Sequence, residues 1–95
     1  MWIRVHLEAE ADLLEAHDFL QNGEAGMAEA FQTEVARTFG MLIEFPKLGR
    51  ALGPVRSVLT RVFRYRIIYQ VAADHIVILA VAHQSRDEAF WYKRL

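Results

Sequence analysis

The residues in this sequence that are best suited to catalysis or binding are cations in its second half. Five arginines and one histidine occur in and around stretches of strand-like alternation, namely Arg56, Arg61, Arg64, Arg66, His83 and Arg86. Arginine donates paired hydrogen bonds to phosphate or carboxylate oxygens, and histidine suits general acid or base work on a phosphodiester. The set therefore predicts either a surface that binds an anionic partner or a site that cleaves a phosphodiester. The alternative is a solvated sheet face, on which single arginines contribute little.

Three aromatic residues near the end of the sequence could also take part in binding. Phe90, Trp91 and Tyr92 have ring faces on which bases can stack. The same rings can instead dock the end of the chain onto the hydrophobic core, and this is the role that we favour.

Several kinds of site lack the residues that they need. The sequence has no cysteine, which excludes disulfides, thiolate zinc sites and cysteine nucleophiles. Its glycines form no phosphate-binding loop, and its four histidines are dispersed rather than spaced as metal ligands. Only Ser57 and Ser85 could serve as serine nucleophiles. We therefore expect no metal and no cofactor.

The charges divide sharply between the two halves of the chain. Residues 1–45 carry two basic and nine acidic side chains, whereas residues 46–95 carry nine basic and three acidic ones. The halves are thus −7 and +6, although the net charge is only −1. This asymmetry suggests an anionic partner for the second half, either nucleic acid or an acidic protein segment. Acidic residues on exposed helices and arginines on strands would give the same division without any partner.

The length and hydropathy predict one domain without a membrane span. A chain of 95 residues, 54% of them hydrophobic, can bury a single core. The longest apolar run covers only residues 76–82, against the roughly 20 residues that a spanning helix needs. The first residues do not have the pattern of a signal peptide. We therefore expect a cytoplasmic protein with no membrane partner.

The periodicity of apolar residues predicts an α+β domain over residues 1–95. It indicates an N-terminal strand, a two-helix hairpin broken at Asn22-Gly23, and a three-strand antiparallel meander. The helices should cover residues 9–22 and 26–45, and the later strands residues 55–59, 63–71 and 76–82. The final stretch, residues 86–95, should be a short helix or a tail.

The two helices are expected to pack on one face of the sheet, since an amphipathic hairpin cannot bury its apolar stripes alone. The second helix has one such stripe, formed by Ala28, Phe31, Val35, Phe39 and Leu42. We expect this stripe to meet Val77, Leu79 and Val81. Strand alternation would then place Arg64 and Arg66 together on the opposite sheet face, where the arginines would form a cleft.

The order of these elements resembles the RelE/ParE superfamily of type II toxin–antitoxin toxins. The similarity spans nearly the whole chain, and four local motifs carry it. They are Ala11-Asp12-Leu13, Phe45-Pro46-Lys47-Leu48-Gly49-Arg50, Tyr65-Arg66-Ile67-Ile68-Tyr69-Gln70-Val71, and residues 76–83 followed by Gln84-Ser85-Arg86-Asp87.

The resemblance implies a small toxin that is neutralised by a cognate antitoxin. The antitoxin would cover the working surface of the toxin with an acidic or amphipathic C-terminal segment. Two activities are known within the superfamily. RelE-like members cleave mRNA on the ribosome, and ParE-like members inhibit DNA gyrase and so replication.

Three features favour the ParE-like activity, which needs no catalytic residues. The pI of about 6.4 is low for a protein that works on ribosomal RNA. RelE-like enzymes resemble this sequence near Arg86, but they carry a catalytic tyrosine four residues later, where this chain has Phe90. Phenylalanine has no hydroxyl and cannot transfer a proton. Lys47 is the only lysine before Lys93, so the lysine pair of the best-known nuclease is missing.

Each possibility implies its own set of residues. A nuclease would use Arg61, His83, Arg86 and Tyr92. Binding of the target or of the antitoxin would use Arg56, Arg61, Arg64, Arg66, His83, Arg86 and Trp91. A third possibility, an inactive relative that only binds its antitoxin, has no signature in the sequence.

Overall fold

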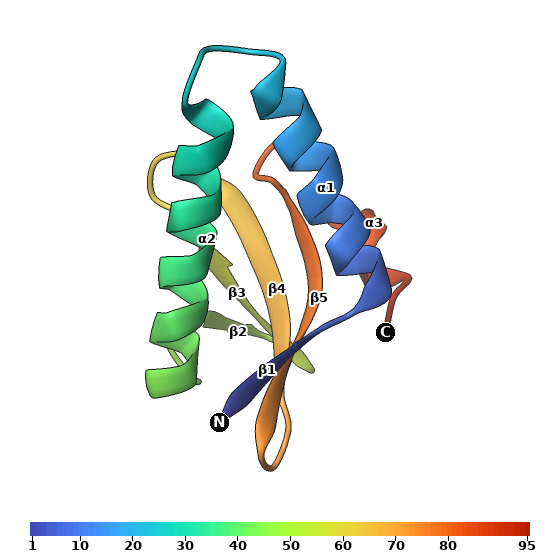
Figure 1. Cartoon of the computed structure of the whole chain (residues 1–95). Coiled ribbons are helices and arrows are strands. Elements are labelled where there is room, and N and C mark those ends of the chain that lie inside the picture. The colour runs from blue at the N-terminus through green and yellow to red at the C-terminus, as the bar shows by residue number, and fades with distance from the viewer.

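In the computed structural model, which describes residues 1–95, a five-stranded sheet carries a helical hairpin on one face (Figure 1). The elements are β1 (Trp2–Val5), α1 (Leu7–Gln21), α2 (Met27–Glu44), β2 (Arg50–Leu52), β3 (Val55–Leu59), β4 (Tyr65–Val71), β5 (His75–His83) and α3 (Ala89–Tyr92). The strand order is β1-β5-β4-β3-β2. β1 runs parallel to β5, and the other neighbours are antiparallel. The predicted fold class is confirmed, and β2 is an additional short strand where the sequence indicated only turns.

The ends of the two long helices follow from local chemistry. The Nδ1 atom of His6 accepts a hydrogen bond from the backbone N–H of Glu8, which caps the first turn of α1. The backbone N–H of Asn22 then bonds back to the carbonyl of Asp18 and ends the helix. α2 ends at Glu44, because Phe45 precedes Pro46 and a residue before proline avoids the helical conformation.

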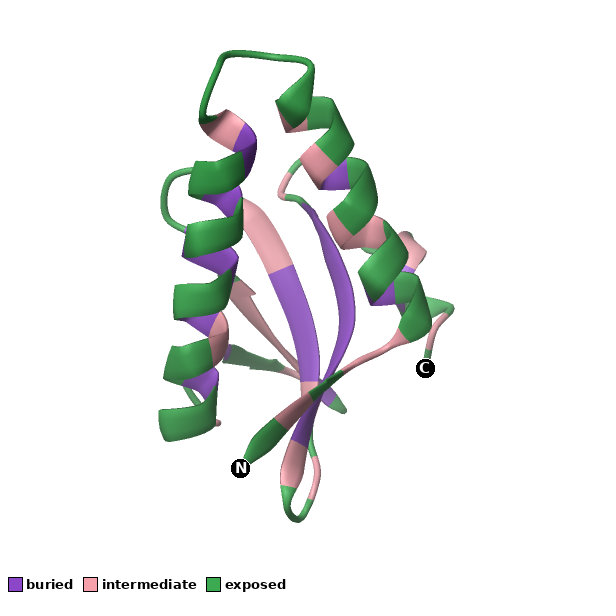
Figure 2. Ribbon diagram, viewed as in Figure 1, coloured by how far each residue is buried: buried purple, intermediate pink, exposed green.

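The main core lies between the helices and the sheet, and Figure 2 shows the buried segments of both helices turned toward the strands. The stripe of α2 supplies Phe31, Val35 and Leu42, all buried. The ring of Phe31 meets Phe63 edge-on, with centroids 5.5 Å apart, and Tyr65 at 4.9 Å. The helix face that the sequence predicted is therefore the one that packs.

The strand partners of this stripe differ from the prediction because β5 contains an irregularity. Ile68 pairs with Ala80 but the next residue, Tyr69, pairs with Ile78, so Leu79 is an extra residue in β5. Such a bulge shifts the alternation of side chains by one position. As a result Val81 packs in the core under the helices, as predicted, but Val77 and Leu79 lie in the cluster on the other face.

The far face of the sheet is not the predicted open cleft of arginines. Its centre is a second apolar cluster, and Trp91 of α3 packs on it with only 3% of its surface exposed. The partners of Trp91 there are Val55, Ile68, Val77, Leu79 and Ala80. The end of the chain thus forms a short helix that covers the face opposite the hairpin.

Candidate functional site

Most of the predicted cationic residues gather at one end of the sheet, where β4 begins and β5 ends. Arg61 and Arg64 lie in the turn between β3 and β4, and Arg66 is the second residue of β4. His83 pairs with the first residue of β4, and Arg86 follows shortly after β5. Arg56 is separate, because it pairs with Tyr69 near the other end of β4.

Arg56 holds a loop of its own chain rather than facing solvent freely. Its Nη1 atom donates to the carbonyl oxygens of Lys47 at 3.3 Å and of Gly49 at 2.8 Å. In the same loop the buried Tyr69 hydroxyl donates to the Pro46 carbonyl and accepts from the Gly49 N–H, both at 2.8 Å. The Phe45-to-Arg50 motif is therefore a structural loop, fixed by side chains of β3 and β4.

The turn between β3 and β4 presents two of the arginines to solvent. Arg61, Val62 and Arg64 are exposed, while Thr60 is buried. Arg64 has a φ of 56° and lies outside β4, so strand alternation does not bring its side chain beside that of Arg66. The expected shared face of these two arginines is therefore not formed.

Arg66 is paired within the fold. Its Nη1 atom lies 3.3 Å from the Oε1 atom of Glu88, and its Nη2 atom donates to the carbonyl of Gln84 at 3.3 Å. Because both partners follow β5, Arg66 ties the start of β4 to the segment that leads into α3. Less of its charge is available to a partner than its position in the sequence indicated.

A cavity of about 480 Å³ lies between α1 and the ends of β4 and β5 and includes His83 and Arg86. Its lining residues are Asp12, Glu15, Ala16, Phe19, Tyr65, Val81, Ala82, His83, Ser85 and Arg86. The His83 ring lies edge-on to Tyr65 at 5.5 Å, and its Nδ1 atom is 2.8 Å from the Ser85 hydroxyl. Burial raises the pKa of the Tyr65 phenol, and the nearby Glu15 carboxylate raises it further.

The predicted nuclease residues are only partly brought together. His83 and Arg86 share the cavity, but Arg61 and Tyr92 do not line it. The Tyr92 ring is exposed and stacks on Trp91, with centroids 5.2 Å apart. The Glu15 carboxylate lines the same cavity, and it would repel the negative charge of a phosphodiester.

Trp91 was among the predicted binding residues, but in the structure it belongs to the core. Its ring is buried beneath α3 against the far face of the sheet. It cannot offer its surface to a partner while α3 stays in place. The docking role that the sequence favoured for the terminal aromatics is the one that Trp91 has.

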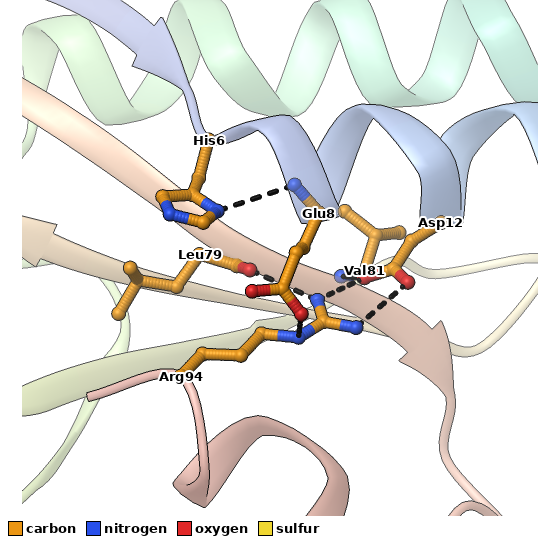
Figure 3. Close-up of polar contacts among 6 residues, drawn as sticks. All are labelled: His6, Glu8, Asp12, Leu79, Val81 and Arg94. Atoms are coloured by element: carbon orange, nitrogen blue, oxygen red, sulfur yellow. Dashed lines mark hydrogen bonds and ion pairs between the residues drawn. The ribbon is translucent and has the colours of Figure 1, made fainter.

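Sequence reasoning missed an ion-pair cluster that joins α1, β5 and the end of the chain (Figure 3). The Arg94 guanidinium donates to both carboxylate oxygens of Asp12, at 2.6 and 3.1 Å, and to the Leu79 carbonyl at 3.0 Å. Its Nε atom lies 3.2 Å from Glu8, and Asp12 also accepts from the Val81 N–H at 2.9 Å. The hydrogen bonds that Arg94 donates to Asp12 raise the pKa of the Arg94 guanidinium.

This cluster completes the edge of β5 beyond the point where β1 ends. The backbone N–H of His6 makes the last bond to β5, at Ile78, and Asp12 and Arg94 then bind the next free backbone groups. Asp12 lies in the motif Ala11-Asp12-Leu13, and this was the available signal that it has a structural role. Nothing in the sequence signalled the role of Arg94.

A buried carboxylate on α2 is the second missed residue. Glu34 is only 6% exposed, and its Oε1 atom accepts the backbone N–H of Val62 at 3.0 Å. An acidic residue one turn after Phe31, within the apolar stripe of α2, was the available signal. Glu34 thus fixes the tip of the β3–β4 turn to the helix.

The structure shows neither a metal-binding cluster nor a membrane-spanning helix. No group of histidine and acidic side chains has the arrangement of a metal site. No helix is both long enough and apolar enough to cross a membrane.

Comparison with known proteins identifies the family of this chain. No curated protein matches the sequence. Residues 3–88 match the protein family described as the ParE toxin of the type II toxin-antitoxin system parDE. The match begins in β1 and continues to the residue before α3, so it covers nearly all of the fold. The chain therefore belongs to the ParE toxin family of type II toxin–antitoxin systems.

Proposed function

We propose that this toxin arrests growth by binding and inhibiting DNA gyrase, and that a cognate antitoxin neutralises it in the cytoplasm. One observation in particular supports an activity without catalysis. The cavity that holds His83 and Arg86 is also lined by the Glu15 carboxylate, and it lacks Arg61 and Tyr92. A site with this balance of charge suits binding of a protein better than cleavage of RNA.

The antitoxin is proposed to reach the same cavity with an acidic or amphipathic segment. Phe19 of α1 lines the cavity and is largely exposed, as is Leu14 on the same helix. An apolar side chain of the antitoxin would bury Phe19, and a carboxylate would pair with Arg86. The guanidinium of Arg86 is already placed over the Phe90 ring, 4.9 Å from its centroid, where it remains exposed.

A RelE-like nuclease is the second candidate, and the proximity of His83 to Arg86 in one cavity is the observation that favours it. For that activity, His83→Ala and Arg86→Ala should each abolish RNA cleavage while the protein stays folded. Cleavage that survives both substitutions would exclude this site as a nuclease centre.

The first experiment is a pulse-labelling measurement after induction of the toxin without its antitoxin. We expect thymidine incorporation to fall before amino-acid incorporation, because inhibition of gyrase stops replication first. An earlier fall of amino-acid incorporation would contradict the proposal and support mRNA cleavage. If neither falls, the chain is an antitoxin-binding relative without toxicity.

A further inference from the structure

We propose that the β3–β4 turn, residues 60–64, is a preformed contact by which the toxin binds an acidic protein surface on its target. The turn carries two exposed arginines, Arg61 and Arg64, which stand in the sequence on either side of the exposed Val62. The inference deepens the proposed function and rests on it, since it assumes that the target is a protein.

The backbone of the turn is held in one shape by hydrogen bonds at both ends. The Thr60 N–H donates to the Tyr65 carbonyl, and the Tyr65 N–H donates to the Thr60 hydroxyl, each at 2.8 Å. The Arg64 carbonyl accepts the Gln84 N–H at 2.9 Å. A contact that is ordered before binding loses less conformational entropy when the partner arrives.

Helix α2 fixes the tip of the turn through Glu34. A buried carboxylate costs free energy unless it is hydrogen-bonded, and the bond that Glu34 accepts is from the backbone of Val62. The next residue, Phe63, packs edge-on against Phe31 of the same helix. Val62 itself points away from these anchors, with 76% of its surface exposed. The fold therefore holds an apolar side chain at the tip in water.

The conformation of Arg64 also points to a role outside the fold. A φ of 56° lies in the left-handed region, which glycine and asparagine adopt far more readily than arginine. The Arg64 side chain is exposed and makes no hydrogen bond or ion pair within the protein. Stability alone would thus favour glycine at this position, and strained residues of this kind concentrate at functional sites.

The chemistry of the turn fits carboxylates on a protein better than phosphates of nucleic acid. Both anions accept paired bonds from arginine, but an exposed valine between two arginines gains free energy only against an apolar surface. An apolar anchor with a charged surround is typical of protein contacts.

The test substitutes Arg64 by residues that accept its backbone conformation, Arg64→Gly and Arg64→Asn. Both variants should melt at or above the temperature of the wild-type protein, because neither strains the backbone at that φ. On induction without antitoxin, both should lose growth arrest, with survivors increasing at least about tenfold, as for loss of one binding hot spot. Arg50→Ala, which removes an exposed arginine of β2, is the matched control and should still arrest growth.

Three results would overturn the inference. Folded Arg64 variants that arrest growth as the wild-type chain does would show that the turn does not contact the target. Binding of a labelled 20-base-pair duplex DNA that depends on Arg64 would assign the turn to nucleic acid instead of protein. A wild-type chain that does not arrest growth at all would refute the proposed function, and the inference with it.

Discussion

Individual polar side chains in this protein mainly hold backbone groups that secondary structure leaves unpaired. Tyr69 accepts a backbone N–H in the loop after α2, and Glu34 accepts one at the tip of the β3–β4 turn. Asp12 accepts one at the free edge of β5. In each case the partner is at least twenty positions away in the sequence. Replacing such a side chain leaves a backbone group without a partner, which costs more than the bond itself contributes.

Removal of the Tyr69 hydroxyl tests this argument directly. Tyr69→Phe should lower the free energy of unfolding by about 2 kcal/mol or more, because the Gly49 N–H and the Pro46 carbonyl both lose their partner. Urea denaturation measures the change. Tyr92→Phe, at an exposed hydroxyl without a hydrogen bond, is the control and should change the free energy by less than about 0.5 kcal/mol. Equal effects of the two substitutions would contradict the assignment.

The Tyr65 phenol gives a prediction for pH. Burial and the Glu15 carboxylate raise its pKa above the ordinary value of 10.0, so its ionisation is harder in the folded protein than in the unfolded chain. The resulting contribution to stability is complete below pH 10 and is lost as the pH rises from there through the folded pKa. Tyrosinate absorbance, compared between the wild-type protein and Tyr65→Phe, measures this pKa. Glu15→Gln should lower it, and no change would exclude the electrostatic cause.

At the scale of elements, the sequence shows which face is buried more clearly for the helices than for the strands. The stripe of α2 was predictable because polar residues on its other faces fix which side is buried. β5 is apolar throughout residues 76–82, so its sequence does not indicate which side chains face the helices. The extra residue at Leu79 then reverses the expected alternation. A pattern with no polar positions cannot reveal a bulge.

Truncation of the central side chain of the α2 stripe should be costly. Phe31→Ala is expected to lower the free energy of unfolding by about 3 to 5 kcal/mol, since the ring is buried and the cavity it leaves is lined by Phe63 and Tyr65. Denaturant midpoints provide the measurement. Phe19→Ala, on the exposed side of α1, should cost less than about 1 kcal/mol. A small effect at Phe31 would mean that the hairpin does not pack as described.

For the whole molecule, the sequence predicted the architecture and the family better than the site. The α+β class, the helical hairpin and the interior position of β5 in the sheet follow from periodicity and from the quoted motifs. The cationic cluster was only partly predictable, because alternation along a strand says nothing about pairing with distant groups. Arg56 and Arg66 are occupied by loop carbonyls and by Glu88, which leaves Arg61, Arg64 and Arg86 as the exposed arginines of that set.

The parallel pairing of β1 with β5 has a consequence for how the toxin is made. Trp2 to Val5 align with His75 to Ile78, so the first strand to leave the ribosome has no partner until nearly the whole chain has been translated. Until then the helical hairpin has no complete sheet to cover, and its apolar stripe stays open to chaperones and proteases. A nascent or prematurely terminated chain should therefore be harmless to the cell that synthesises it. The complete fold, and any activity that depends on it, can form only after translation has passed β5.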